Sequence, residues 1–319
     1  SYDTFSGCAM ISVAGFNTSI DRWLSLKTLR TGEVQRMQEA GYAPGGKGLH
    51  VALTCATLGE EVRLVGIISK SEEAYVGKCL DDAGVIFQSV RVAGNLRDCL
   101  AIHEQSGRTT ELLGPGPSLS RAESSALDSA ALAGVMSEDI MVFSGSVPSD
   151  YPAFSYQNLI ISARKLGAYA IIDSSGDLLR EAITGCPDLI KMNAHEASEL
   201  AGQRIDGKKQ AIGFSKTLLG QGVGAVVVSL GASGAVLVTP SSAWVLAVPE
   251  IEVRSAVGAG DCLVAGIATA LSRKESLEEA FRLGGACGAA KTRRIESGVL
   301  DASDVSLFKE MVQVSRWHE

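Results

Sequence analysis

Residues that form disulfides or hold structural metals are few and scattered in this sequence. Its seven cysteines include no C-x-x-C pair, and its four histidines include no H-E-x-x-H motif. An odd number of dispersed cysteines does not indicate a disulfide framework, and their spacing does not indicate a zinc site. We therefore expect a reducing compartment, the cytoplasm.

Excess positive charge and long apolar runs are also lacking. The 319 residues include 29 Lys and Arg against 36 Asp and Glu, which gives a net charge of −7. Such a surface repels phosphate polymers, so no nucleic-acid partner is expected. No basic region followed by an apolar run begins the sequence, which predicts no signal peptide. The uncharged segment 217–249 is divided by glycines and by Thr-Pro-Ser-Ser into strand-sized runs, so we expect buried strands there and no membrane contact.

Glycine and alternating apolar segments, in contrast, are plentiful. Short apolar runs such as 62–68 and 140–144 alternate with amphipathic segments such as 49–58 and 303–314. This alternation predicts one α/β domain over residues 1–319, a three-layer α/β/α sandwich with a mainly parallel central sheet. The segments 17–42 and 87–113 contain predicted strands and turns but no helix. We expect them to form a small inserted β-sheet that acts as a lid.

One glycine-rich segment, Gly41-Tyr-Ala-Pro-Gly-Gly-Lys-Gly48, precedes a predicted helix. It is one residue short of a P-loop, because Gly48 stands where that motif needs Ser or Thr, and no buried strand precedes it. A flexible backbone with Lys47 at a helix N-terminus suits an anionic or hydroxylated small ligand. An ordinary turn with a solvated lysine is the alternative.

Two further glycine-rich segments follow in the second half. Gly258-Ala259-Gly260-Asp261 leads directly into an apolar helix, but Leu263 replaces the third glycine of a dinucleotide-binding fingerprint. Its backbone N–H groups would converge on an anion, and Asp261 is either a helix cap or a catalytic group. The segment 229–234 forms a predicted turn at the end of a buried strand, where α/β proteins bind nucleotides.

Six motifs together give the sequence a family resemblance. They are Pro44-Gly-Gly-Lys-Gly-Leu-His-Val-Ala52, Val142-Phe-Ser-Gly-Ser-Val-Pro148, Asp173-Ser-Ser-Gly176, Lys191-Met-Asn-Ala-His-Glu196, Ser229-Leu-Gly-Ala-Ser-Gly234 and Val257-Gly-Ala-Gly-Asp261. In this order they resemble the PfkB carbohydrate kinases of the ribokinase-like superfamily, from about residue 11 to residue 300. The most similar branch contains 1-phosphofructokinase, tagatose-6-phosphate kinase and the minor 6-phosphofructokinase. The resemblance implies a ribokinase-like fold and a kinase that uses ATP and Mg²⁺.

The resemblance also implies roles for individual residues. Asp261 would be the general base beside an anion hole formed by the backbone of Gly258, Ala259 and Gly260. The remaining assignments are Lys191, Asn193, Ser229, Gly231, Ala232 and Gly234 for ATP; Glu196 with Asn193 for magnesium, largely through water; Asp21, Gly45, Gly46 and His50 for the sugar; and Arg97, helped by Lys47, Arg36 and Ser146, for its phosphate. The alternative for Arg97 is a plain surface ion pair with Asp98.

The expected substrate is a ketohexose phosphate. We favour a 1-phosphofructokinase-type reaction, in which the 6-hydroxyl of fructose 1-phosphate attacks the γ-phosphate of ATP; tagatose-6-phosphate kinase and 6-phosphofructokinase are alternatives. His50 replaces the asparagine of the family motif and so changes a contact to the sugar. Further alternatives are a kinase of an unphosphorylated sugar or nucleoside, and a catalytically silent binding protein on this fold. A homodimer formed through the lid is expected.

Overall fold

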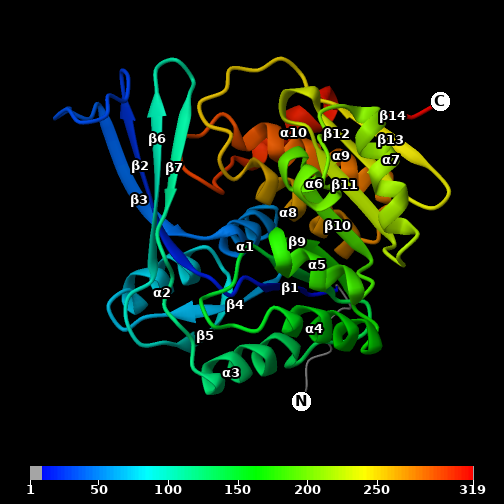
Figure 1. Ribbon diagram of the computed structural model, residues 1–319, viewed down its shortest axis with the longest axis horizontal. Helices are drawn as coiled ribbons and strands as arrows, with labels where there is room; N and C mark the ends of the chain where they lie inside the picture. Colours follow the sequence, from blue (N-terminus) through cyan, green and yellow to red (C-terminus); the bar gives the residue numbers. More distant parts are fainter. Residues whose placement is uncertain (1–8, 319) are drawn as a thin grey trace.

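A ten-stranded sheet forms the centre of the computed structural model, which describes residues 9–318 (Figure 1). In spatial order its strands are β14 (Gln313–Arg316), β13 (Ala243–Ala247), β12 (Ala235–Val238), β11 (Ala225–Ser229), β10 (Leu189–Asn193), β9 (Tyr169–Asp173), β8 (Ile140–Ser144), β1 (Ile11–Ala14), β4 (Val62–Ile68) and β5 (Ile86–Arg91). Neighbours from β11 to β5 pair in parallel, and those from β11 to β14 pair antiparallel. The predicted mainly parallel sheet is confirmed.

Helices cover both faces of this sheet. One layer contains α1 (Lys47–Thr57), α8 (Ala259–Ser272), α9 (Leu277–Lys291) and α10 (Ala302–Met311). The other contains α3 (Arg121–Leu132), α4 (Phe154–Lys165), α5 (Gly176–Thr184), α6 (Ala194–Ala201) and α7 (Lys208–Leu219), while α2 (Glu73–Asp82) connects β4 to β5. Every residue of β4 and of β8 is buried, as continuous apolar strands covered on both faces should be. The three-layer α/β/α architecture is confirmed.

A second, four-stranded sheet stands at one side of this body (Figure 1). We call it the small sheet; its order is β3 (Glu39–Gly45), β2 (Ser19–Leu26), β6 (Arg97–Glu104) and β7 (Thr109–Leu113). The β2–β6 pair is parallel, and the two outer pairs are antiparallel. Only residues 15–18 separate β1 from β2, so the small sheet begins at the carboxyl end of a central strand.

Two of the sequence-based boundaries are wrong. Residues 87–91, part of the predicted lid segment 87–113, belong to β5 and pair in parallel with β4 in the central sheet. The helix α2 makes the crossover between these strands, so they complete a β-α-β unit. The predicted helix 303–314 ends at Met311, and residues 313–316 form the edge strand β14, paired with β13.

The strand order reverses between β1 and β8, since β1 leads through α1 to β4 on one side and β8 leads through α4 to β9 on the other. In open α/β sheets such a switch point leaves a crevice at the carboxyl ends of the strands, where ligands bind. Within residues 9–318, no helix has the length and apolar character needed to cross a bilayer. The six cysteines in that range are free thiols, and Cys8 lies outside it.

Candidate active site

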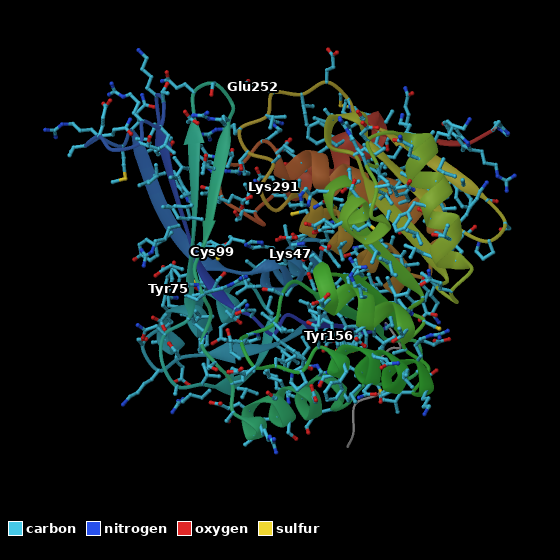
Figure 2. The ribbon with its side chains drawn as sticks, viewed as in Figure 1. Lys47, Tyr75, Cys99, Tyr156, Glu252 and Lys291 are labelled. Carbon is cyan, nitrogen blue, oxygen red and sulfur yellow. The ribbon has the colours of Figure 1, made fainter. Side chains whose placement is uncertain are left out.

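A cavity of about 1270 Å³ lies between the small sheet and the carboxyl ends of the central strands. Figure 2 shows Cys99 on its small-sheet side and Lys47, in the first turn of α1, on its body side. The cavity brings together most of the residues assigned from the sequence: Asp21, Gly46, Lys47, His50, Arg97, Ser146, Lys191, Asn193, Glu196, Ser229, Gly231, Ala232, Gly234, Gly258, Ala259, Gly260 and Asp261.

Two residues assigned to the sugar phosphate are placed differently. Gly45 lies behind the cavity wall, where an added Cβ would overlap the carboxyl group of Asp21. It therefore acts by leaving room for that side chain. Arg36 is exposed in the connection between β2 and β3, and it does not line the cavity of its own chain.

The first turn of α8 presents unsatisfied donors to the cavity. Gly258, which precedes the helix, has φ 82°, and a Cβ there would lie 2.7 Å from the backbone nitrogen of Gly298. Only glycine suits this left-handed, crowded position. No side chain caps α8, and within residues 9–318 the N–H groups of Gly260 and Asp261 have no acceptor. A helix end of this kind can bind an anion, with the helix dipole adding to the attraction, and the Asp261 side chain does not cap it.

Asp261 instead belongs to a buried chain of three side chains. Its Oδ2 lies 2.8 Å from Nδ1 of His50, and Nε2 of His50 lies 3.1 Å from Oδ2 of Asp21. The hydroxyl of Ser19 donates to the other oxygen of Asp21 at 2.7 Å. Burial alone would raise the pKa of Asp21, but the hydrogen bond and charge of His50 outweigh it and the pKa lies below its ordinary value. Both ring nitrogens of His50 are thus occupied by carboxylates.

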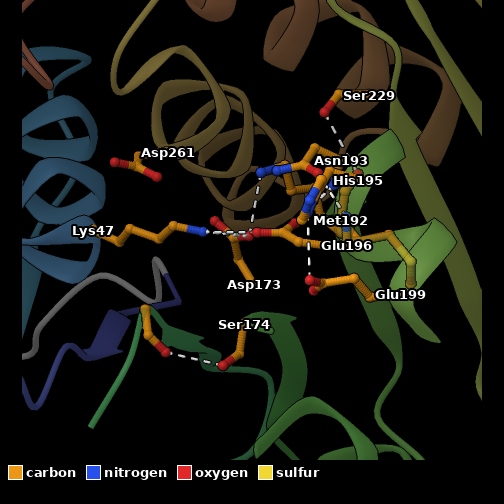
Figure 3. A network of polar contacts seen from close by, with 12 residues as sticks. Lys47, Asp173, Ser174, Met192, Asn193, His195, Glu196, Glu199, Ser229 and Asp261 are labelled. Atoms are coloured by element: carbon orange, nitrogen blue, oxygen red, sulfur yellow. Dashed lines mark hydrogen bonds and ion pairs between the residues drawn. The ribbon is translucent and has the colours of Figure 1, made fainter. Parts of the chain in front are cut away.

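Two lysines, Lys47 and Lys191, form ion pairs with one buried carboxylate, that of Asp173. Asp173, at the end of β9, lies 3.2 Å from the Nζ of Lys191 and 3.7 Å from that of Lys47. Lys47 also contacts Oε1 of Glu196 at 3.3 Å, and Figure 3 shows its side chain extending toward both acids. The charge of Asp173, with that of Glu196, holds the pKa of Lys47 well above its usual range despite burial.

This cluster faces the start of α8. A Cβ on Gly260 would lie 2.6 Å from the Nζ of Lys191, so the ammonium borders the free N–H groups. The ammonium of Lys47 lies in this cluster through its contacts with Asp173 and Glu196. Asp173 was not among the assigned residues, although it begins one of the six motifs and follows a buried strand, which is the usual place for a functional side chain in this architecture.

Glu196 has a structural role as well. Its Oε2 accepts from the backbone N–H of Asn193 at 2.8 Å, and Oδ1 of Asn193 accepts from the N–H of Glu196 at 2.9 Å. This reciprocal capping box begins α6.

Among residues 9–318 no three His, Cys, Asp or Glu side chains form a metal cluster, but Oδ2 of Asp173 is buried without a partner. These carboxylates fit a magnesium ion that takes most of its ligands from phosphates and water.

On the small-sheet side, Arg97 is the cation that faces the cavity. Its Nε is buried and has no hydrogen-bond partner among the described residues. The neighbouring Asp98 pairs with Arg22 at 2.6 Å. The ion pair of Asp98 is therefore with Arg22 and not with Arg97, which was the alternative. Burial, together with the charges of Asp21 and Asp261, raises the pKa of the nearby Glu111.

The far end of the cavity is suited to a flat apolar group. The short helix η1 (Gly231–Ser233), directly after β11, forms one wall, and Ser229 and Gly234 flank it. Leu246, Val248, Ile251 and Leu263 supply apolar surface. The sequence-based assignment found the glycine turn but not these apolar residues, because nothing distinguishes them locally from other core positions.

Comparison with known proteins shows the family and the fold of the chain. The family described as pfkB family carbohydrate kinase matches residues 10–301. The 1-phosphofructokinase of Bacillus subtilis is 30% identical over 289 residues, 91% of this chain and 94% of that protein. Phosphofructokinase-2 of Escherichia coli, solved with substrates and products, superposes with a TM-score of 0.88 at 27% identity, covering 95% of this chain and 99% of that one. Ribokinase of Thermotoga maritima shares the fold, with a TM-score of 0.75 at 21% identity over 95% of this chain and 100% of that one.

Replacing Asp173 with asparagine tests the charge cluster. The ammonium of Lys191, whose side chain is only 3% exposed, would lose its carboxylate. We expect the free energy of unfolding to fall by roughly 3–5 kcal/mol, as for other broken buried ion pairs. Inorganic phosphate should raise the melting temperature of Asp173→Asn more than that of the wild type, since it would replace the missing charge.

The matched control is Asp177→Asn, because Asp177 is exposed and pairs only at 3.8 Å with Arg180. It should change stability by no more than about 0.5 kcal/mol. Denaturant unfolding that gave the same stability for Asp173→Asn and the wild type would contradict the proposed cluster.

Proposed function

The chain belongs to the pfkB family of carbohydrate kinases, and on that premise we propose that it transfers the γ-phosphoryl group of ATP to a ketohexose phosphate, in a 1-phosphofructokinase-type reaction. The observation that carries the proposal is the uncapped start of α8, with Asp261 beside it and two lysines facing it. A phosphoryl group held there would meet two N–H donors and two ammonium groups. Phosphoryl transfer requires mainly such positioning and charge neutralisation.

Asp261 supplies the proton acceptor. A sugar hydroxyl bound between Asp261 and the α8 N-terminus would attack the γ-phosphorus, so that an O–P bond forms as the bond to the ADP oxygen breaks. The hydroxyl proton passes to the Asp261 carboxylate. His50 contacts Oδ2 of Asp261, and no residue in the range 9–318 forms a hydrogen bond with Oδ1. The Oδ1 atom is therefore the one that would accept the proton.

The two ends of the cavity fit the two substrates. The apolar slot beside η1 would hold the adenine. Asn193 pairs in register with Ser229 next to η1, and the Nζ of Lys191 borders the start of α8. A magnesium ion would be held through water by Glu196 and Asp173 and would neutralise charge on the phosphates. At the opposite end Arg97 offers to the phosphate of the sugar a guanidinium group whose Nε has no partner among residues 9–318, and Asp21 offers its carboxylate to the sugar hydroxyls.

A direct test is the release of ADP across a panel of acceptors. We propose fructose 1-phosphate as the preferred substrate, with the Bacillus subtilis relative in support. The panel should contain fructose 1-phosphate, fructose 6-phosphate, tagatose 6-phosphate, fructose and ribose. Preference for another phosphorylated ketohexose would correct the sugar, whereas preference for an uncharged one would remove the sugar-phosphate assignment.

The small sheet is proposed to act as a lid and as a dimer surface. It carries one wall of the cavity, so its movement toward the body would exclude water from the phosphates. Its edge strands expose apolar side chains, Tyr42 on β3 and Leu112 on β7, at 60% and 56%. Unpaired strand edges with such residues favour pairing with a second copy.

The first prediction from this proposal concerns Asp261. Asp261→Asn should lower kcat by roughly 10²–10⁴-fold, the usual contribution of a positioned general base. The affinity for ATP, measured by calorimetry, should hardly change, since the N–H groups and lysines remain. A variant that kept more than about a tenth of the wild-type turnover would show that Asp261 is not the base.

A second prediction separates a phosphorylated substrate from an uncharged one. Arg97→Ala should lower kcat/KM for the sugar phosphate about 10- to 150-fold, because a charge-assisted guanidinium–phosphate contact contributes about 1.5–3 kcal/mol. The KM for ATP should remain nearly constant. Arg22→Ala is the matched control, since Arg22 pairs with Asp98 on the surface. Equal, small effects of both variants would argue against a phosphate at Arg97.

A third prediction isolates the charge of Glu196 from its capping role. In Glu196→Gln the amide oxygen can still accept from the N–H of Asn193, so the capping box should be preserved. The magnesium concentration needed for half-maximal rate should rise, because the carboxylate charge beside Lys47 is lost. A magnesium titration identical to that of the wild type would leave Glu196 with only its capping role.

A further inference from the structure

His50 is held between two carboxylates by both of its ring nitrogens. Nδ1 faces Asp261 at 2.8 Å and Nε2 faces Asp21 at 3.1 Å. The side chain is only 6% exposed, and Gly298 packs directly against the ring, where a Cβ would overlap it. The ring is therefore nearly enclosed, with a carboxylate at each nitrogen.

We propose that His50 is a positioning residue, a doubly protonated bridge that fixes the carboxylate assigned to the sugar, Asp21, relative to the carboxylate assigned to its proton, Asp261. This inference rests on the proposed function for the roles of the two acids. It adds a residue that touches neither the phosphoryl group nor, through its nitrogens, the sugar.

The arrangement of donors and acceptors requires the second proton. A neutral imidazole carries one N–H and can donate to one carboxylate only, while ionised carboxylates can only accept. With a neutral ring, one of the two contacts would set a lone pair against a buried carboxylate. An imidazolium satisfies both contacts and also separates two negative charges that would otherwise repel each other across the site.

The acids around the ring favour this state, and the cations oppose it. The acids are Asp21 on β2, Asp261 on α8 and Glu111 on β7; the cations are Arg97 on β6, Lys47 on α1 itself and Lys291 on α9; the thiols of Cys99 and Cys262 are the other titratable groups nearby. Burial alone would lower the pKa of His50, but the hydrogen bonds to Asp21 and Asp261 and the charges of those acids outweigh it and raise the pKa to about 9. The bridge is therefore complete at neutral pH and is lost as the pH rises through about 9.

The bridge gives a physical reason for His50, which stands where the family motif has asparagine. An amide donates only from its nitrogen, so asparagine could not span the two acids in the same way. In this chain the residue gives up any N–H contact with the sugar and couples the two carboxylates instead. Sugar binding at Asp21 and proton transfer at Asp261 then depend on one ring.

Nuclear magnetic resonance of ¹⁵N-histidine-labelled protein tests the bridge without using activity. The chain has four histidines, so the signal missing from His50→Asn identifies His50. At pH 7 we expect both of its ring nitrogens to be protonated, with titration near pH 9. In Asp21→Asn the same titration should move down toward the ordinary value of about 6.5, because one of the two acids is neutral. A neutral His50 ring in wild-type protein at pH 7 would overturn the proposal.

Kinetics then test the positioning role. For the wild type, kcat/KM for the sugar phosphate should fall on the alkaline side near pH 9, where the bridge is lost. His50→Asn should lower kcat/KM about 10- to 100-fold, the cost of modest misplacement, and should remove that alkaline limb. The KM for ATP should not change. An unchanged alkaline limb in His50→Asn would contradict the role.

His103→Asn is the matched control. His103 is also buried, but it lies in the small sheet with Thr109 as its partner at 3.1 Å, and burial lowers its pKa. This variant should keep the wild-type pH profile. Wild-type protein that phosphorylated no sugar phosphate, while His50 was doubly protonated, would overturn the proposed function and leave the bridge standing. Active wild-type protein with a neutral His50 would overturn the bridge and leave the proposed function standing.

Discussion

The uncompensated N–H groups at the start of α8 are the feature around which the rest of the site is arranged. The protein carries a net charge of −7, so it has no general attraction for a nucleotide and must neutralise phosphate locally. In the proposed function it does so with one helix end and two lysines, Lys47 and Lys191, that share the buried carboxylate of Asp173. Without an anion, Asp173 balances the lysines. With phosphate present, the same ammonium groups have a second negative partner in reach.

Close packing holds this helix end in place. Gly266 on α8 meets Gly284 on α9 so closely that a Cβ on Gly266 would lie 2.8 Å from the Gly284 Cα. The ammonium of Lys291, at the end of α9, donates to the carbonyl oxygens of Ser255 and Arg294, both at 3.1 Å. The segment that leads into Gly258 is thereby tied to the end of α9. Rigid support of this kind is what a site needs if its donors are to face a transferring group without rearranging.

Much of this organisation could be predicted from sequence, because continuous apolar runs and glycine turns are local signals. The run 62–68 coincides with β4, and the turn before Asp261 forms the start of α8 as expected. The edge strand β5 was assigned to the lid because its exposed, polar pattern lacks the signature of a buried strand. The His50–Asp261 contact could not be predicted, since it joins residues 211 positions apart and depends on how α1 packs against α8. Sequence identified each partner but not the contact.

The most direct measurement of the central claim is the ³¹P spectrum of the products formed from ATP and fructose 1-phosphate. We predict two phosphate esters on one sugar, with ADP formed in equal amount and no inorganic phosphate, because in the proposed function Asp261 activates a sugar hydroxyl and the small sheet excludes water. Inorganic phosphate with unchanged fructose 1-phosphate would mean that water is the acceptor. That result would contradict the assignment of fructose 1-phosphate as the acceptor held beside Asp261.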